Sequence, residues 1–217
     1  MASIPLAGQL APPRGLTWQI VEFLERTSSA VLLVALSPLL CLTAAVVAWL
    51  SGSTPLIAHR RVGWRGATLW MLKFRTMWDG TSWPRTGWIE YIDDEAGPQR
   101  KQAGDCRVVH GFAAFCRRHS IDELPQLVHV IRGEMSLVGP RPLTAAELQK
   151  HYGPVAAEVL EAKPGIAGLW QTSGRNRLSY SQRRQLDLQF VRTCSLRMYG
   201  KILLRTIPEI WSGANSW

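Results

Sequence analysis

Two adjacent carboxylates, Asp122 and Glu123, are the side chains of this 217-residue chain with the clearest potential for chemistry. They lie in the segment Ser-Ile-Asp-Glu-Leu-Pro-Gln-Leu, residues 120–127, where the pattern predicts the start of a helix. An ionised carboxylate can act as a nucleophile or bind Mg²⁺ through oxygen. Acidic residues are also common in the first turn of a helix, where they complement the dipole. The pair alone leaves a catalytic and a capping interpretation open.

Three basic residues upstream of this pair could neutralise the charge of a phosphate. Lys73 and Arg75 alternate within Lys-Phe-Arg-Thr-Met, residues 73–77, and in a strand both would face the same side. Arg117 precedes the acidic pair directly, beside a second arginine and a histidine. The alternative interpretation is a solvated strand face and simple surface ion pairs, which contribute little to stability.

Two further cations lie in turns rich in proline and glycine. Arg141 stands between two prolines, so its backbone is nearly fixed and its guanidinium is held ready for bidentate contact with a phosphate. Arg175 ends a glycine-rich loop that begins at Lys163, and such loops can cradle phosphates with backbone N–H groups. Each turn could equally be a plain connection. The chain has no GxxxxGK[ST] or GxGxxG motif, so the common nucleotide-binding loops are not supported.

A charge-free segment, residues 27–50, precedes these basic turns and is long enough to reach across the hydrocarbon core of a bilayer. Ser37-Pro38 divides it almost in half, and the proline predicts a kink. A signal peptide fits poorly, because the apolar stretch is too long and little positive charge precedes it. A kinked spanning helix and a hairpin that enters and leaves by one face both remain open.

The composition around this segment also favours a membrane surface. The formal net charge of +9 suggests a partner that carries phosphates. Six of the ten tryptophans lie between Trp49 and Trp88, and tryptophan favours the membrane–water interface. The basic cluster at residues 59–65 directs that end of the segment toward the cytoplasm. The four cysteines lack metal-binding spacing and are predicted to be free thiols in a reducing compartment.

We divide the chain into a flexible tail (1–17), a membrane-inserted helical segment (18–54) and a globular domain (55–217). The fold class expected is α/β, mostly helical with a small sheet. Gly133 is a predicted helix stop, and Thr144 with Glu147 forms a predicted capping box. The domain is expected to contain a strand at 68–77, an irregular loop at 78–105, and helices at 112–118, 124–132, 144–161, 181–193 and 199–211.

The sequence resembles the bacterial sugar transferase family, the monotopic polyprenyl-phosphate phosphoglycosyl transferases in their short form. The resemblance covers roughly residues 20–210 and depends on four elements in order, which together are highly specific. These elements are Ser37-Pro38, residues 73–77, residues 122–142 and residues 164–175.

The resemblance implies a reaction: a sugar-1-phosphate is transferred from a UDP-sugar to a membrane polyprenyl phosphate such as undecaprenyl phosphate, with Mg²⁺ required and UMP released. Asp122 would form a covalent phosphosugar intermediate, and Glu123 would assist with the metal or the proton. We expect the helix start to keep Asp122 ionised and aimed at the phosphate. The expected phosphate-binding residues are Lys73, Arg75, Arg117, Arg141 and Arg175, with Asp187 matching a recurrent acid of the family.

The resemblance also implies a location. The segment around Ser37-Pro38 would be a re-entrant helix–break–helix in contact with membrane lipids of the bacterial inner membrane, and residues 55–217 would be the catalytic domain on its cytoplasmic face. The product would feed exopolysaccharide, capsule or O-antigen assembly. A homodimer is compatible with the sequence.

Two positions depart from the family pattern. Tyr199 or Gly200 stands where a late acidic residue is usual, and His129 stands where asparagine is common. A non-catalytic, membrane-anchored protein that binds nucleotide-sugar or lipid phosphate is therefore the alternative function. No nucleic-acid partner is expected, because the chain carries no recognisable motif for one and the membrane segment argues against it.

Overall fold

The structure is a computed structural model, and it describes residues 15–78, 87–93, 111–174 and 178–212. Most of the predicted tail, most of the predicted 78–105 loop and Arg175 lie outside these residues.

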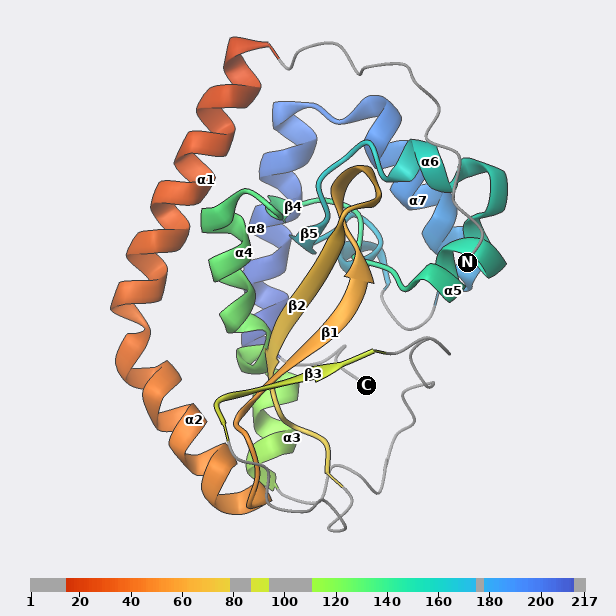
Figure 1. Ribbon diagram of the computed structural model, residues 1–217. Coiled ribbons are helices and arrows are strands. Elements are labelled where there is room, and N and C mark those ends of the chain that lie inside the picture. Colours follow the sequence, from red (N-terminus) through yellow and green to blue (C-terminus); the bar gives the residue numbers. More distant parts are fainter. Residues whose placement is uncertain (1–14, 79–86, 94–110, 175–177, 213–217) are drawn as a thin grey trace.

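The apolar N-terminal segment forms two helices, α1 (Leu16–Ala35) and α2 (Ser37–Ser51), which make a long arm along one side of the molecule (Figure 1). They meet at a bend of 61°. Pro38 has no N–H for the carbonyl of Val34 one turn earlier, and the Ser37 hydroxyl donates a hydrogen bond of 2.7 Å to that carbonyl instead. The predicted break at Ser37-Pro38 is confirmed.

The length and composition of this arm are compatible with a membrane. Taken singly, none of the described helices is both long and apolar enough to cross a bilayer, whereas the bent pair α1 and α2 together meets that requirement. The arm also leaves large apolar side chains uncovered: Val34 is 74% exposed and Trp49 is 82% exposed.

A three-stranded sheet lies beside the arm. β1 (Leu56–Val62) pairs antiparallel with β2 (Thr68–Phe74) and parallel with β3 (Ile89–Ile92), so the strand order is β2-β1-β3. The strand predicted at 68–77 is confirmed over most of its length. β3 lies inside the stretch that was expected to be wholly irregular, so that expectation was wrong for these four residues.

One face of β2 packs on helix α4 (Leu127–Arg132). Side chains alternate along a strand, so Leu69 and Met71 both point toward this helix, where they meet Val130 and Met135 in a buried cluster. Gly133 ends α4 with φ at 77°, as predicted, and the Arg26 guanidinium of α1 lies where a Cβ would stand.

A second, two-stranded parallel sheet joins β4 (Ser136–Val138) to β5 (Gly165–Ala167). The two strands approach so closely at one end that a Cβ on Gly165 would lie 2.0 Å from the backbone nitrogen of Gly139. The sequence predicted a glycine-rich loop from Lys163 to Arg175, and instead a strand begins inside it at Gly165. The missing side chains explain this, because only glycine permits such contact between backbones.

The predicted capping box at Thr144 is confirmed, but the long helix expected after it is wrong. The Glu147 backbone N–H donates to the Thr144 hydroxyl, and α5 (Ala145–Glu147) begins there. The chain then passes through a π turn and a 3-10 turn before α6 (Ala156–Val159). Gly153 takes a positive φ of 50° and proline follows it, so a continuous α-helix cannot pass this point.

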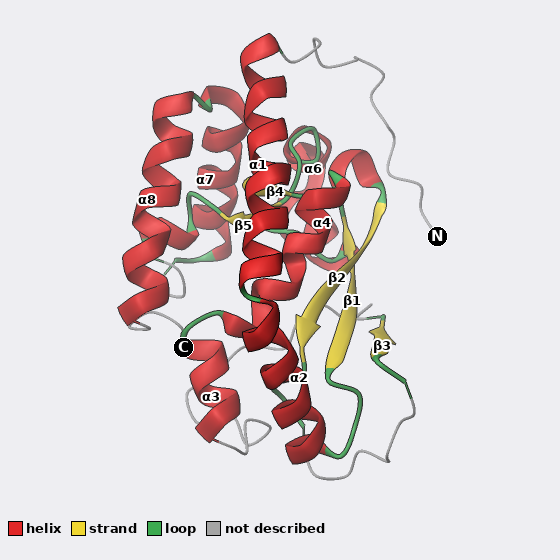
Figure 2. Cartoon of the chain, turned by 90° about the vertical axis from the view of Figure 1, so that its left-hand side faces the viewer, coloured by secondary structure: helices red, strands yellow, loops and turns green. Residues whose placement is uncertain are grey.

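The last two helices, α7 (Tyr180–Thr193) and α8 (Leu196–Ser212), confirm the two predicted near the C-terminus. Viewed from the side on which the arm lies, they are on one side of α1 and the three-stranded sheet is on the other (Figure 2). Phe190 and Ile202 pack on the two-stranded sheet. The fold is mostly helical with two small sheets, in agreement with the expected class.

Candidate active site

The acidic pair lies in a 3-10 turn, Ile121–Gln126, between α3 (Gly111–Arg118) and α4. Ser120 precedes the turn in the left-handed conformation, with φ at 55°, and its side chain makes no capping hydrogen bond. The expected helix start at the pair is confirmed, but it is a 3-10 turn that leads directly into α4. Pro125 has no N–H to offer the carbonyl of Ile121, so the regular helix begins only at Leu127.

The two carboxylates have different surroundings. Asp122 is buried. Glu123 is partly accessible and forms an ion pair with Lys73 of β2, whose Nζ lies 2.7 Å from Glu123 Oε1. The strand alternation that places Leu69 and Met71 against α4 also directs Lys73 toward the turn. The structure thus brings one predicted phosphate-binding cation to the predicted dyad.

Helix α3 also contributes to the surroundings of Asp122. Burial raises the pKa of the Cys116 thiol to about 11, and the negative charge of Asp122 contributes to this rise. Cys116 is accordingly a neutral thiol and not a second nucleophile. Arg117 Nη1 lies 3.5 Å from the Thr76 hydroxyl, and its Nε has no hydrogen-bond partner among the described residues. This guanidinium therefore retains donor capacity beside the dyad.

Arg75 lies apart from the other predicted cations. Its guanidinium is buried, donates at 2.8 Å to both the carbonyl and the hydroxyl of Thr54, and pairs with Glu90 of β3. Contact with a phosphate would require these bonds to break, so the structure gives Arg75 a role in joining β3 to the start of β1. Arg175 lies outside the described residues, and its predicted role stays a prediction.

Beside Glu123 lies a pocket of about 80 Å³ between the 3-10 turn, β5 and α8. Its polar side chains come from the dyad, from the loop after β5 and from α8, and its remaining walls are aliphatic. Gln171 contributes a buried Oε1 atom without a hydrogen-bond partner among the described residues. The residues that line it are Ser120, Glu123, Leu124, Leu127, Ile166, Ala167, Gln171, Thr172, Thr206, Glu209 and Ile210.

Arg141 belongs to a second cluster, around Asp187 of α7. The Asp187 carboxyl is 1% exposed and accepts a hydrogen bond of 2.7 Å from the Tyr152 hydroxyl. Its other oxygen has no hydrogen-bond partner in the part of the chain that the structure describes. Burial raises the pKa of Asp187 to about 7, although the Tyr152 hydrogen bond and the charges of Arg141 and Arg183 oppose the rise.

Three members of this cluster, Tyr152, Trp170 and Arg183, were not among the predicted site residues. The Trp170 ring has the guanidinium of Arg183 at 4.7 Å and that of Arg141 at 5.9 Å from its centroid. A cation over an aromatic face is stabilised by the ring quadrupole. Trp170 lies within the glycine-rich loop of the sequence, and an aromatic residue in such a loop was the available signal.

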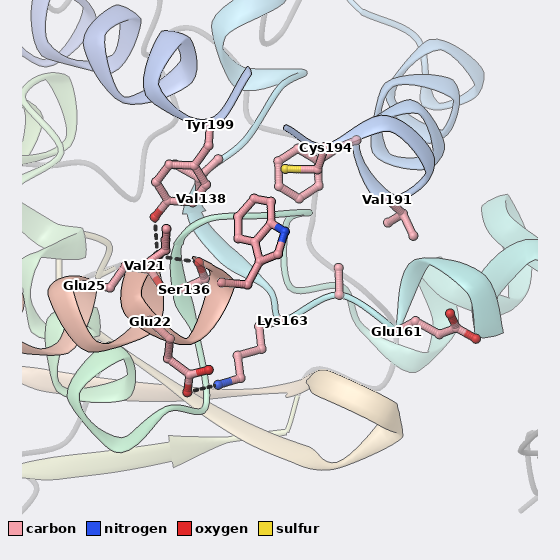
Figure 3. Close-up of a pocket in the computed structure, with 13 residues that line it drawn as sticks. Val21, Glu22, Glu25, Ser136, Val138, Glu161, Lys163, Val191, Cys194 and Tyr199 are labelled. Carbon is pink, nitrogen blue, oxygen red and sulfur yellow. Dashed lines mark hydrogen bonds and ion pairs between the residues drawn. The ribbon is translucent and has the colours of Figure 1, made fainter. Parts of the chain in front are cut away.

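Glu25 of α1 was also missed as a structural centre. Its buried carboxylate accepts hydrogen bonds from the Ser136 hydroxyl, from the Leu137 backbone N–H at 2.6 Å and from the Tyr199 hydroxyl (Figure 3). Burial raises the pKa of the Tyr199 hydroxyl, and the adjacent Glu25 charge adds to this effect. Tyr199, at the position where a late acid was expected, thus serves to fasten α8 to the arm.

The Glu25 network borders a larger cavity of about 250 Å³, which shares no lining residue with the pocket at Glu123. Figure 3 shows a second polar contact at its edge, where Lys163 pairs with Glu22 at 2.5 Å. Lys163 therefore holds the loop before β5 to α1, and its ammonium group is already neutralised there.

His129, the other departure from the family pattern, is also buried. Its Nε2 accepts a hydrogen bond of 3.2 Å from the Leu72 backbone N–H, and its Nδ1 lies 2.5 Å from a carboxylate oxygen of Glu134. This arrangement requires the neutral imidazole with its proton on Nδ1. His129 thereby joins α4 to β2, next to the strand residue that contacts Glu123.

The sequence was also compared with those of known proteins. The sequence model of the family described as bacterial sugar transferase matches residues 17–213. The exopolysaccharide production protein ExoY of Rhizobium meliloti (strain 1021) is 39% identical over 193 residues, which are 88% of this chain and 84% of that protein. The UDP-glucose:undecaprenyl-phosphate glucose-1-phosphate transferase of Caulobacter vibrioides is 36% identical, over 89% of this chain and 70% of its own length. The undecaprenyl-phosphate galactose phosphotransferase of Salmonella typhimurium is 32% identical over 87% of this chain, which spans 40% of that larger relative.

Proposed function

The chain belongs to the bacterial sugar transferase family, and we propose that it is a phosphoglycosyl transferase that moves a sugar-1-phosphate from a UDP-sugar to a polyprenyl phosphate. The printed names of two relatives, one of them matched over most of its length, describe transfer of this kind to undecaprenyl phosphate. The observation that carries the proposal is the acidic pair Asp122-Glu123, held in one turn beside Lys73 and next to an open pocket.

We propose a transfer in two steps. A carboxylate oxygen of Asp122 attacks the phosphorus that bears the sugar, the bond to the bridging oxygen breaks, and UMP leaves. An oxygen of the polyprenyl phosphate then attacks the same phosphorus, which forms the lipid diphosphate-sugar and frees the Asp122 carboxylate. Division into two steps means that the two anionic substrates need not be neutralised together. Asp122 is buried in the unliganded chain, so the phosphate has to reach it along the accessible side of Glu123.

The donor set suits a Mg²⁺ ion that is bound mainly through its substrate. Mg²⁺ commonly takes one or two carboxylates and completes its shell with phosphate oxygens and water. No group of three or more acidic, histidine or cysteine ligands occurs among the described residues, and the pair Asp122-Glu123 supplies two carboxylates. These two residues would hold the ion, which would stabilise negative charge on the phosphates. Lys73 forms an ion pair with Glu123.

We also propose that the arm is re-entrant and that the catalytic domain lies on the cytoplasmic face of the inner membrane. The support is the 61° bend and the exposed apolar side chains on both helices. Single cysteines placed before α1 and after residue 55 test this arrangement with a membrane-impermeant label applied from outside the cell. Both sites should stay unlabelled, whereas labelling of the N-terminal site alone would contradict a re-entrant arm.

UMP release tests the activity. Purified protein is incubated with Mg²⁺, undecaprenyl phosphate and each common UDP-sugar in turn, and UMP is measured. We expect release that depends on one UDP-sugar and disappears in Asp122→Asn, which keeps the size of the side chain but not its charge. Absence of UMP with every donor would count against the enzyme and would favour a non-catalytic binding protein.

A further inference from the structure

The pocket beside Glu123 combines two carboxylates with apolar walls. The side chains of Leu124 and Leu127, from the turn and the start of α4, face those of Ile166 and Ile210, from β5 and α8. Such aliphatic walls offer no hydrogen bonds, so they favour a hydrocarbon ligand over a hydroxylated one. The two carboxylates are Glu123 of the dyad and Glu209 of α8.

An uncovered apolar patch continues outward from this pocket. Ile210 both lines the pocket and is exposed, and Ile207 on the next turn of α8 is 63% exposed. His119 Nδ1 lies 2.9 Å from the Ile210 carbonyl oxygen, and this contact joins the end of α3 to α8. The exposed Phe115 packs against the His119 ring and therefore also lies near Ile210. The patch, formed by Phe115, Ile207 and Ile210, therefore connects the surface to the pocket.

Charge at this edge of the molecule complements an anionic lipid surface. Exposed basic side chains stand on the two helices that meet there: Arg118 on α3 and Arg205 on α8. Basic residues near apolar ones are typical of helices that rest on membranes with anionic headgroups. The patch and these cations together indicate that the mouth of the pocket faces lipid.

We propose that this pocket binds the first isoprenoid units of the polyprenyl phosphate acceptor. The proposal builds on the proposed function and adds the place where the acceptor enters. A lipid phosphate has to rise out of the bilayer to reach the dyad, so the carbons next to it lose their contact with lipid. The aliphatic walls replace that contact and hold the phosphate oxygen facing the phosphosugar on Asp122. Attack by this oxygen forms the new bond to phosphorus as the bond to the Asp122 oxygen breaks.

Pocket filling tests this assignment. Thr206 is half-buried on the pocket wall, and Thr206→Phe would occupy much of its space. Leu204→Phe is the matched control, because Leu204 lies on the same helix, is 70% exposed and does not line the pocket. Two rates are measured for each variant: exchange of labelled UMP with UDP-sugar, which needs no acceptor, and complete transfer over a range of polyprenyl phosphate concentrations.

We expect Thr206→Phe to raise the KM for polyprenyl phosphate by at least about tenfold, equal to about 1.4 kcal/mol, while the KM for UDP-sugar in exchange changes less than about twofold. Leu204→Phe should change neither constant. A rise in the KM for UDP-sugar would assign the pocket to the sugar and overturn the proposal, as would an unchanged KM for the lipid. If the unaltered protein shows neither exchange nor transfer, the proposed function itself fails, which is a distinct result.

Discussion

Asp187 should make the stability of this protein fall as the pH rises from about 4 to about 7. Its carboxyl is almost fully buried, it receives a single hydrogen bond from Tyr152, and burial raises its pKa from 3.8 to about 7. In the unfolded chain it returns to its ordinary pKa. Below pH 3.8 both states are protonated and nothing is lost. Between pH 3.8 and 7 the unfolded chain releases a proton that the folded chain keeps, so the free energy of unfolding decreases as the pH rises.

The size of this effect follows from the shift. A displacement of roughly 3 pKa units, at 1.36 kcal/mol each, amounts to about 4 kcal/mol of stability lost by pH 8. Asp187→Asn removes the titrating group and keeps an oxygen that can accept from the Tyr152 hydroxyl. For a chain of this length 1 kcal/mol corresponds to about 2–4 °C in Tm, so the variant should melt roughly 10 °C higher than the unaltered protein at pH 8. At pH 4 the two should nearly coincide.

Thermal unfolding from pH 4 to pH 8, in one detergent and at fixed ionic strength, measures this difference. Asp93→Asn is the control, because Asp93 is a partly exposed carboxylate that pairs with Arg60 at 2.8 Å. Exposed pairs contribute little, so its Tm should move by about 2 °C or less. If the difference in Tm between Asp187→Asn and the unaltered protein does not grow with pH, burial does not raise the pKa of Asp187.

Two further predictions concern the backbone. Gly165→Ala should cost at least about 3 kcal/mol of stability, because its Cβ would meet the nitrogen of Gly139, whereas Gly200→Ala, whose Cβ meets open space within α8, should gain about 0.5–1 kcal/mol. Denaturant unfolding of both variants measures this, and a similar effect at the two sites would contradict it. Pro38→Ala should straighten the arm from its 61° bend, because the N–H to the Val34 carbonyl is restored. Spin labels at the two ends of the arm should then move apart, and an unchanged distance would show that the bend has another cause.

Features that depend on neighbours in the chain could be predicted from the sequence. The break at Ser37-Pro38, the capping box at Thr144 and the helix stop at Gly133 each result from the conformational limits of one or two residues. The 144–161 helix failed for a local reason that was available in the sequence, namely Gly153 followed by proline. The 3-10 geometry at the dyad also has a local cause, because Pro125 has no N–H for an α-helical hydrogen bond.

Contacts between distant residues could not be predicted. Glu25 and Tyr199 are 174 residues apart and meet only because α1 and α8 pack on the same small sheet. The different places of Lys73 and Arg75, one at the dyad and the other buried against Thr54, depend on what packs beyond the end of β2. The alternation of side chains along a strand shows which side of the strand a residue faces, but not which residue it contacts there.

The central claim is that Asp122 carries the sugar phosphate during transfer. Intact-mass and peptide mass spectrometry of the protein after brief incubation with UDP-sugar and Mg²⁺, without lipid acceptor, tests it most directly. We expect a mass increase of one sugar phosphate on the peptide that contains Asp122, lost on addition of polyprenyl phosphate and absent in Asp122→Asn. An adduct that persists in Asp122→Asn, or lipid transfer by the unaltered protein through no covalent intermediate, would contradict it.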